Sequence, residues 1–291
     1  MVRNRARKRR TTNKAPVWSI GIFSGPKLSA LKPVTEMPVL SAEQVTDIPA
    51  EFVADPFMIQ AGNTWFMFFE VMNAQTGRGE IGLAKSLDGI HWDYQQIVLS
   101  ESFHLSYPYV FGADGEYFMI PESYEANAIK LYRAVSFPTK WEPMKTILEG
   151  AWVDSSVFFL NGLWWLFTNP LAPRNQRLEL FYSASIIGPW YRHPMSPLVS
   201  SNHRIARGGG RLVVADDRPV RFGQDCFPSY GTSIRAFEIT VLETSGYAER
   251  ELEGSPILGP GSLPWNRSGM HHIDAHFINN GWLACVDGWR T

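Results

Sequence analysis

The chain has 291 residues, of which 45% are hydrophobic and 19% are charged. These fractions are ordinary for a globular protein and exclude an intrinsically disordered chain, a collagen-like repeat and a disulfide-rich scaffold. The 27 basic and 28 acidic residues give a net charge of −1. Seven basic residues and no acid fall in the first 14 positions, so the remaining chain carries 20 basic and 28 acidic residues, a net charge of −8. An acidic body argues against a nucleic-acid-binding domain, which needs a basic face.

The N-terminal segment, residues 1–16, is a basic arm that we expect to be a flexible, solvated tail. The alternatives for such a basic run are contact with RNA or with a membrane surface. No stretch of the chain approaches the roughly 20 apolar residues that a membrane-spanning helix needs. Two widely separated cysteines, Cys226 and Cys285, fit no metal-binding spacing and suit a reducing compartment. We therefore expect a cytoplasmic protein, with secretion as the alternative.

From residue 55 onward the chain repeats one local pattern, in which a short apolar strand, a tight turn and a second apolar strand follow one another. The turns contain Gly-Asn, Asp-Gly or Asn-Gly and lie at residues 62–63, 114–115, 161–162 and 280–281. Such a turn between β-branched and aromatic runs is a strong signal for a β-hairpin. No amphipathic helix of normal length is evident, so the sequence predicts an all-β protein.

The hairpins belong to larger units that recur at intervals of roughly 50 residues, which is typical of a repeat architecture. A tryptophan stands near the outer end of several units, at Trp92, Trp141 and Trp190. Five units of about four strands each predict a five-bladed β-propeller of four-stranded antiparallel blades, spanning residues 17–291. A β-sandwich is the alternative, but it does not explain a repeated unit with a recurring outer tryptophan.

The propeller predicts where polar residues converge, because the first strand of each blade runs along the central channel. The five first strands open at one end of that channel with, in chain order, an acid, an aromatic residue, a second acid, a base and an imidazole. These positions are Asp55, Tyr107, Asp154, Arg207 and the group His271/His272/Asp274. Convergent polar groups in a concave site are the default hypothesis for a binding site. We therefore expect a ligand-binding funnel there.

The two acidic openings, residues 54–57 and 153–158, resemble the first and third blades of the family 43 glycoside hydrolases and their five-bladed relatives. The resemblance implies that Asp55 is the general base and that Asp154 orients the site and raises the pKa of the acid. Taken alone, Asp55 before a proline could cap a turn, and Asp154 followed by two serines could also lie in a turn.

The fourth unit departs from this family, because Arg207 stands where the glutamate general acid is expected. An arginine cannot donate a proton near neutral pH, but it can bind a phosphate or carboxylate bidentately, or form a salt bridge to Asp55 or Asp154. Glu122 and Glu70 end matching second strands. We select Glu122 as the substitute acid, since a partly apolar funnel can raise the pKa of a carboxyl. Inverting hydrolysis needs two carboxyls about 6.5–9.5 Å apart.

Other positions complete the predicted substrate site. The ring of Tyr107 is expected to stack on a sugar face, and Gln224 and Asp225 to hydrogen-bond sugar hydroxyls, with loop caps as the alternative for the latter two. The resemblance matches His271 or His272 to the fifth-blade histidine that lines the pocket.

A metal site would be the alternative use of the last unit. On a strand His272, Asp274 and His276 share one face, which is the pattern of a metal site. We expect instead one pocket histidine with neighbours in the channel wall, and neither a metal nor another cofactor.

A second resemblance covers roughly residues 17–290. It rests on residues 18–22, 54–57, 65–70, 106–110, 120–123 and 154–156 taken together. These motifs resemble the propeller domain that precedes the catalytic domain of plant glucosamine inositolphosphorylceramide transferases. The resemblance implies the fold without bringing an established activity, and we expect no counterpart of the transferase domain in this chain.

Two functions follow as expectations. The first is a carbohydrate-active, glycosidase-like protein with Asp55 as base, Asp154 as orienting carboxylate and Glu122 as acid. The second is a non-catalytic module that binds a glycan or a sugar phosphate and assists a partner glycosyltransferase. A propeller scaffold for protein partners is a third, more remote alternative.

Overall fold

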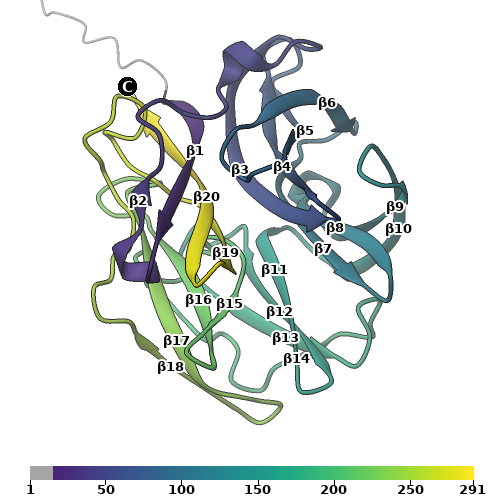
Figure 1. Cartoon of the computed structure of the whole chain (residues 1–291). Helices are drawn as coiled ribbons and strands as arrows, with labels where there is room; N and C mark the ends of the chain where they lie inside the picture. The colour runs from purple at the N-terminus through teal and green to yellow at the C-terminus, as the bar shows by residue number, and fades with distance from the viewer. Residues whose placement is uncertain (1–15) are drawn as a thin grey trace, which may run out of the picture.

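The computed structural model describes residues 16–291. Five four-stranded antiparallel sheets surround a central axis, as Figure 1 shows, and this arrangement confirms the predicted five-bladed β-propeller. The basic arm predicted for residues 1–16 lies, apart from its last residue, outside the described part of the chain. Among the described residues no helix is long and apolar enough to cross a membrane.

The blades follow one another along the chain, except that the last blade takes two strands from the N-terminal end. Three short 3-10 turns, η1 (Leu28–Ala30), η2 (Ala42–Gln44) and η3 (Tyr124–Ala126), lie between strands. Blade 1 contains β3 (Ala50–Ala61), β4 (Thr64–Asn73), β5 (Arg78–Ser86) and β6 (Asp93–Leu99). Blade 2 contains β7 (Ser106–Ala113), β8 (Glu116–Glu122), β9 (Ala128–Ser136) and β10 (Lys140–Glu149). Blade 3 contains β11 (Trp152–Leu160), β12 (Leu163–Pro170), β13 (Glu179–Ser183) and β14 (Tyr191–Arg192). Blade 4 contains β15 (Val213–Ala215), β16 (Arg218–Asp225), β17 (Ser233–Glu243) and β18 (Gly246–Glu251); blade 5 contains β19 (Ile273–Ile278), β20 (Gly281–Arg290), β1 (Val17–Gly25) and β2 (Lys32–Pro33).

The tight turns between first and second strands have the backbone that their residues favour. In blades 2 and 3 the pairs at 114–115 and 161–162 have positive φ at both positions, as a two-residue type I′ turn requires. Blade 5 differs from the prediction by one residue. Its turn residues are Asn279 and Asn280, both at positive φ, and Gly281 already pairs with Ile278. Asparagine tolerates the left-handed region, so no glycine is needed within that turn.

Two of the recurring outer tryptophans, Trp92 and Trp141, have a common structural role, whereas the indole N–H of the third, Trp190, has no hydrogen-bond partner among the described residues. The indole N–H of Trp92 donates to the carbonyl of Gly89 at 3.0 Å, and that of Trp141 donates to the carbonyl of Pro138 at 2.9 Å. Both rings are buried at or beside the fourth strand of their blades. Each ring therefore fixes the tight turn that leads into the outermost strand and also covers the core.

The ring of blades closes through β1, which the repeat pattern starting at residue 55 does not reveal. This strand pairs with β20 in antiparallel register from Val17–Arg290 to Gly25–Trp282. Its residues Ile20 and Ile22 are fully buried in a cluster that also contains blade 1 residues. Strand β1 therefore completes blade 5 and at the same time packs it against blade 1.

An ion pair between Arg211 and Asp274, together with its hydrogen bonds, links four of the blades. Arg211, which precedes β15, donates to Asp274 Oδ1 at 2.6 Å and to the carbonyl of Val110 at 2.8 Å, and its guanidinium lies 4.8 Å from the centre of the Tyr109 ring. The other oxygen of Asp274 accepts the N–H of Met58 at 2.6 Å. Burial opposes ionisation of Asp274, but the adjacent Arg211 holds the pKa of its carboxyl well below the usual value. These contacts join blades 1, 2, 4 and 5.

Closure by β1 predicts a large effect of truncating its buried side chains. Replacing Ile20 with alanine should lower the free energy of unfolding by about 2–5 kcal/mol, because the side chain is fully buried and leaves a cavity. Val17→Ala is the matched control on the same strand, with 37% of its surface exposed, and should change stability by less than about 1 kcal/mol. Urea unfolding measures both, and equal losses would contradict this role of β1.

Candidate functional site

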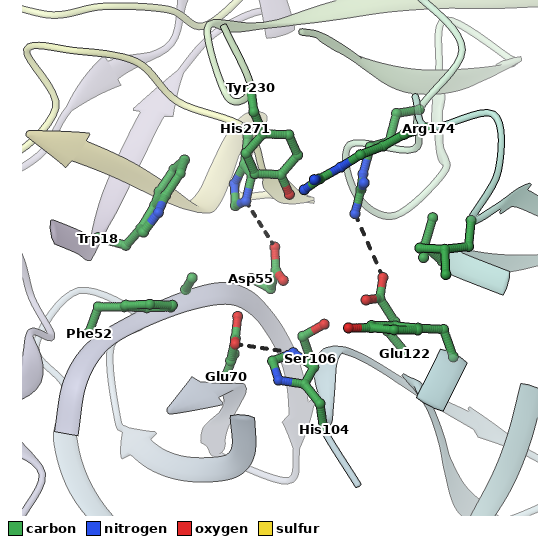
Figure 2. A pocket seen from close by; sticks show the side chains of 15 residues that line it. Trp18, Phe52, Asp55, Glu70, His104, Ser106, Glu122, Arg174, Tyr230 and His271 are labelled. Carbon is green, nitrogen blue, oxygen red and sulfur yellow. Dashed lines mark ion pairs between the residues drawn. The ribbon is translucent and has the colours of Figure 1, made fainter. Parts of the chain in front are cut away.

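A cavity of about 370 Å³ opens at the end of the axis where the blade-opening residues converge. All five blades contribute to the 15 residues that line it (Figure 2). Four of the predicted site residues are among them, namely Asp55, Glu122, Arg207 and His271. The other five, Tyr107, Asp154, Gln224, Asp225 and His272, lie behind or below this lining.

The first strands of blades 1 to 3 share a backbone feature, a β-bulge with a residue in the left-handed region. Asp55, Tyr107 and Asp154 have φ values of 51°, 46° and 49°, in the left-handed region. At each of them the pairing between first and second strand shifts, as at a β-bulge. Bulges redirect side chains and are common beside functional sites. A non-glycine residue in this region is strained, so surrounding contacts must hold it there.

Hydrogen bonds from the preceding blade hold two of these bulges. The N–H of Asp55 donates to Asp287 Oδ2 at 3.0 Å, and the N–H of Asp154 donates to Glu122 Oε2 at 3.1 Å. Both acceptors lie near the end of the second strand of the preceding blade. The carboxyls of the site therefore also fix the backbone of the next blade.

Tyr107 is fully buried below the cavity, which corrects its predicted role. Its hydroxyl lies 2.9 Å from Ser156 Oγ, and its ring packs edge-on against Phe57 and His272. The burial contradicts the predicted stacking on a sugar, because no face of the ring is open to a ligand. His272 is buried in the same layer, and neither of its ring nitrogens has a hydrogen-bond partner among the described residues.

Gln224 and Asp225 are also buried and do not line the cavity. The side-chain amide of Gln224 donates to Asp154 Oδ2 at 3.1 Å and to the carbonyl of Gly208 at 2.7 Å. The carboxylate of Asp225 forms an ion pair with Arg235 at 2.9 Å. The predicted contacts with sugar hydroxyls are therefore not available to them, since these polar groups are committed to protein partners.

Arg207 forms the salt bridge to Asp154 that the sequence left as an alternative. The pair is bidentate: Nε donates to Oδ2, and Nη2 donates to Oδ1 at 3.2 Å. Nη1 donates to Asn175 Oδ1 at 2.8 Å, and Nη2 lies 3.7 Å from Glu122 Oε2. Both charged side chains are buried. Most of the hydrogen-bonding capacity of Arg207 is therefore used within the protein.

Three buried carboxyls face the cavity with free acceptor oxygens. Among residues 16–291, no hydrogen bond reaches the carboxylate oxygens of Asp55 or Glu70, although His104 Nε2 lies 3.5 Å from Glu70 Oε1, and Glu122 accepts a backbone N–H on one oxygen only. Burial raises the pKa of Asp55 to about 7. Burial, reinforced by neighbouring carboxylates, raises the pKa values of Glu70 and Glu122 well above the usual range.

The imidazole of His271 lies beside Asp55. It stacks on Trp18 with ring centres 4.0 Å apart, and its Nδ1 lies 2.8 Å from Asp287 Oδ1. Its Nε2 is 3.8 Å from Asp55 Oδ1. Burial opposes a charge on the ring, but the Asp287 carboxylate raises the pKa of His271 above its ordinary value. The strand β1 therefore helps to position the imidazole through Trp18.

Asp55, His271 and Asp287 are the residues of the described chain that could hold a metal ion. Each offers one ligand atom, and these atoms lie within 4.8 Å of one another. The trio differs from the set that the sequence pattern suggested, in which Asp274 is committed to Arg211. A histidine and two carboxylates would suit a transition metal, but the contact between His271 and Asp287 is already complete without one.

Several lining residues carried no signal in the repeat pattern. Trp18, His104, Arg174 and Tyr230 come from the closing strand and from loops rather than from blade openings. Figure 2 shows Tyr230 and Arg174 on one side of the cavity and Glu70 and Glu122 on the other, with Asp55 between them.

Residues 11–289 match a family model described as "Glucosamine inositolphosphorylceramide transferase 1, N-terminal". The chain belongs to this family. A relative from Oryza sativa subsp. japonica, glucosamine inositolphosphorylceramide transferase 1, is 36% identical over 298 residues, and the protein of the same name from Arabidopsis thaliana is 38% identical over 298 residues. The match covers 94% of this chain but 40% and 39% of those relatives.

Several solved structures share the fold of this chain. A thermostable family-43 glycoside hydrolase has a TM-score of 0.65 at 14% identity, covering 84% of this chain and 89% of that chain. The catalytic domain of a Coprinopsis cinerea GH62 alpha-L-arabinofuranosidase has a TM-score of 0.59 at 11% identity, covering 81% and 90%. At such low identities these structures show the fold alone.

The Arg207–Asp154 pair predicts a strong effect of removing one partner. Arg207→Met should lower the free energy of unfolding by about 3–5 kcal/mol, because Asp154 is left as an uncompensated buried charge. Adding Asp154→Asn should restore part of the loss. The pair of exposed Arg250 with Glu238 provides the control, and Arg250→Met should cost less than about 1 kcal/mol. Urea unfolding distinguishes the outcomes, and equal costs at the two sites would contradict this assignment.

The raised pKa of Asp55 predicts a pH-dependent stability. The folded protein retains this proton up to about pH 7, whereas the unfolded chain releases it near pH 4. The contribution of Asp55 to stability is therefore lost as the pH rises from about 4 to about 7. Relative to the wild type, Asp55→Asn should gain stability between pH 5 and pH 8 in urea unfolding. The control Asp93→Asn, at an exposed carboxylate on β6, should show no such gain.

Proposed function

We propose that the protein binds a carbohydrate in the funnel cavity and hydrolyses a glycosidic bond there, with Asp55 as general base and Glu122 as general acid. The observation that carries this proposal is that two buried carboxyls with raised pKa values face one cavity. Acid–base hydrolysis of a glycoside needs two such carboxyls, one holding its proton and one without it.

The surroundings of the two carboxyls suit these different roles. A pKa of about 7 leaves a substantial fraction of Asp55 ionised near neutral pH, as a base requires. Burial and the Asp154 carboxylate both raise the pKa of Glu122 well above its usual range, as a proton donor requires, although Arg207 opposes this. Asp154 would thereby have the role expected of it from the sequence, acting on the acid without reaching the cavity itself.

The lining also supports a sugar as the ligand. Trp18, Phe52, Tyr124 and Tyr230 offer aromatic surface, and the free carboxyl oxygens can accept hydrogen bonds from hydroxyls. The family takes its name from a glycosyltransferase, and the similar solved structures are glycoside hydrolases. Both support a carbohydrate as the class of ligand.

A non-catalytic role is the second candidate. The residue at the expected acid position, Arg207, is locked to Asp154, an arrangement that favours binding over proton donation. The match spans about two fifths of the length of the plant relatives. In this alternative the funnel would hold a glycan or a sugar phosphate for a glycosyltransferase.

Product formation tests the hydrolytic proposal. The wild type is incubated with a panel of oligosaccharides and aryl glycosides, and products are followed by mass spectrometry. Asp55→Asn and Glu122→Gln should each lower product formation at least 100-fold while leaving ligand binding largely intact, since general acid–base groups contribute about 10²–10⁴-fold. The wild-type kcat/KM should rise with pH through about 7, where Asp55 ionises.

Glu116→Gln is the matched control, because Glu116 lies on the same strand as Glu122 but is exposed. It should leave activity unchanged. Binding without product in the wild type would overturn hydrolysis in favour of the second candidate. Full activity of either Asp55→Asn or Glu122→Gln would refute the assigned roles.

A further inference from the structure

The cavity contains one cation that differs from the others in its contacts. Arg174 lies in the loop between β12 and β13 and lines the cavity with an exposed side chain. Within residues 16–291 it forms no salt bridge or hydrogen bond through its guanidinium, which lies 5.8 Å from the centre of the Tyr230 ring. A positive charge therefore faces an acidic cavity without a protein partner.

The other basic groups of the lining are already engaged. Arg207 is paired with Asp154, and His271 with Asp287. The Nδ1 of His104 accepts the N–H of Gly79 at 2.9 Å, and burial lowers the pKa of this imidazole. A negatively charged ligand would therefore find its free cationic partner at Arg174.

A second donor lies beside this guanidinium. The hydroxyl of Tyr230 has no hydrogen-bond partner in the described part of the chain, and its ring is fixed by edge-on packing against His271 at 5.1 Å. Figure 2 shows the Arg174 side chain reaching toward Tyr230 on the side of the cavity away from Glu70 and Glu122. One side thus offers free donors and the other offers carboxyls.

This division of the cavity restricts which chemical groups a ligand can place on each side. A guanidinium is planar and presents paired N–H groups that match the oxygens of a phosphate or a carboxylate. An oxyanion placed against the carboxyl side would find no free cation there and would be repelled by ionised Asp55, whereas beside Arg174 and Tyr230 it would be attracted. Hydroxyls of the same ligand could then donate to the free oxygens of Asp55 and Glu70.

We infer that the cavity selects a sugar bearing an oxyanion, a phosphate or a carboxylate, and that Arg174 is the residue that determines this specificity. The inference rests on the proposed function in taking a sugar as the ligand, and it does not require hydrolysis. It assigns the anionic group to the side formed by Arg174 and Tyr230, and the neutral hydroxyls to the carboxyl side.

Matched ligand pairs test the inference. Glucose, galactose, mannose and myo-inositol are each compared with a phosphate ester, and the hexoses also with their uronates, by calorimetric or ligand-observed NMR titration of the full chain at low salt. At least one anionic member should bind about tenfold or more tightly than its neutral parent, as expected for a hydrogen bond to a charged group. Arg174→Ala should reduce this preference to about twofold or less, and Arg174→Lys should retain part of it.

The controls separate a local contact from general charge. Arg250→Ala removes an equal charge from the exposed outer strand β18 and should keep the preference. Added salt should weaken the preference of the wild type, because the guanidinium is exposed. A preference confined to phosphates or to uronates would identify the kind of oxyanion. No anionic preference in the wild type, or an unchanged one in Arg174→Ala, would overturn the inference.

Failure of this inference can be told apart from failure of the proposed function. Cleavage that depends on Asp55 but shows no anionic preference would overturn the specificity of Arg174 and leave hydrolysis standing. Binding of anionic sugars through Arg174 without any product would support the specificity of Arg174 and overturn hydrolysis.

Discussion

The antiparallel pairing of β1 with β20 is the interaction on which the rest of the molecule depends. It completes blade 5 with a strand from the opposite end of the chain and packs that blade against blade 1. Only a closed ring brings the openings of all five blades to one point. The same strand carries Trp18, which stacks on His271, so ring closure and assembly of the cavity are a single event.

Architecture and site share the same side chains. Near the ends of second strands Asp287 and Glu122 accept the N–H of the residue that opens the next blade, Asp55 and Asp154 respectively. Asn169 accepts the N–H of Gly208, which follows the opening residue Arg207. Glu70 occupies the matching place on β4, yet its carboxyl accepts no such bond from the described residues and faces the cavity. The same position near the end of the second strand therefore hydrogen-bonds to the backbone of the next blade in three blades, whereas in blade 1 it faces the cavity, where a ligand could reach it.

The sequence predicts the repeat, because hairpin turns and outer tryptophans are local signals with a fixed spacing. It also indicates Asp55, Glu122, Arg207 and His271 as funnel residues. It fails at Tyr107, because the position of a bulge in the chain does not reveal whether the side chain points into the cavity or beneath it. It cannot indicate Arg174 or Tyr230, which reach the cavity from loops whose paths depend on tertiary contacts rather than on strand periodicity.

The closing strand also has a mechanical consequence. Since Val17 pairs with Arg290, the two ends of the propeller lie side by side at one end of the two central strands of blade 5. Tension applied between them would load the hydrogen bonds of β1 and β20 one after another, as in the opening of a zipper, rather than all at once. The seam that completes the ring is therefore its weakest point under a pull on its ends, whereas the four blades formed by consecutive strands bear no such load until the seam has opened.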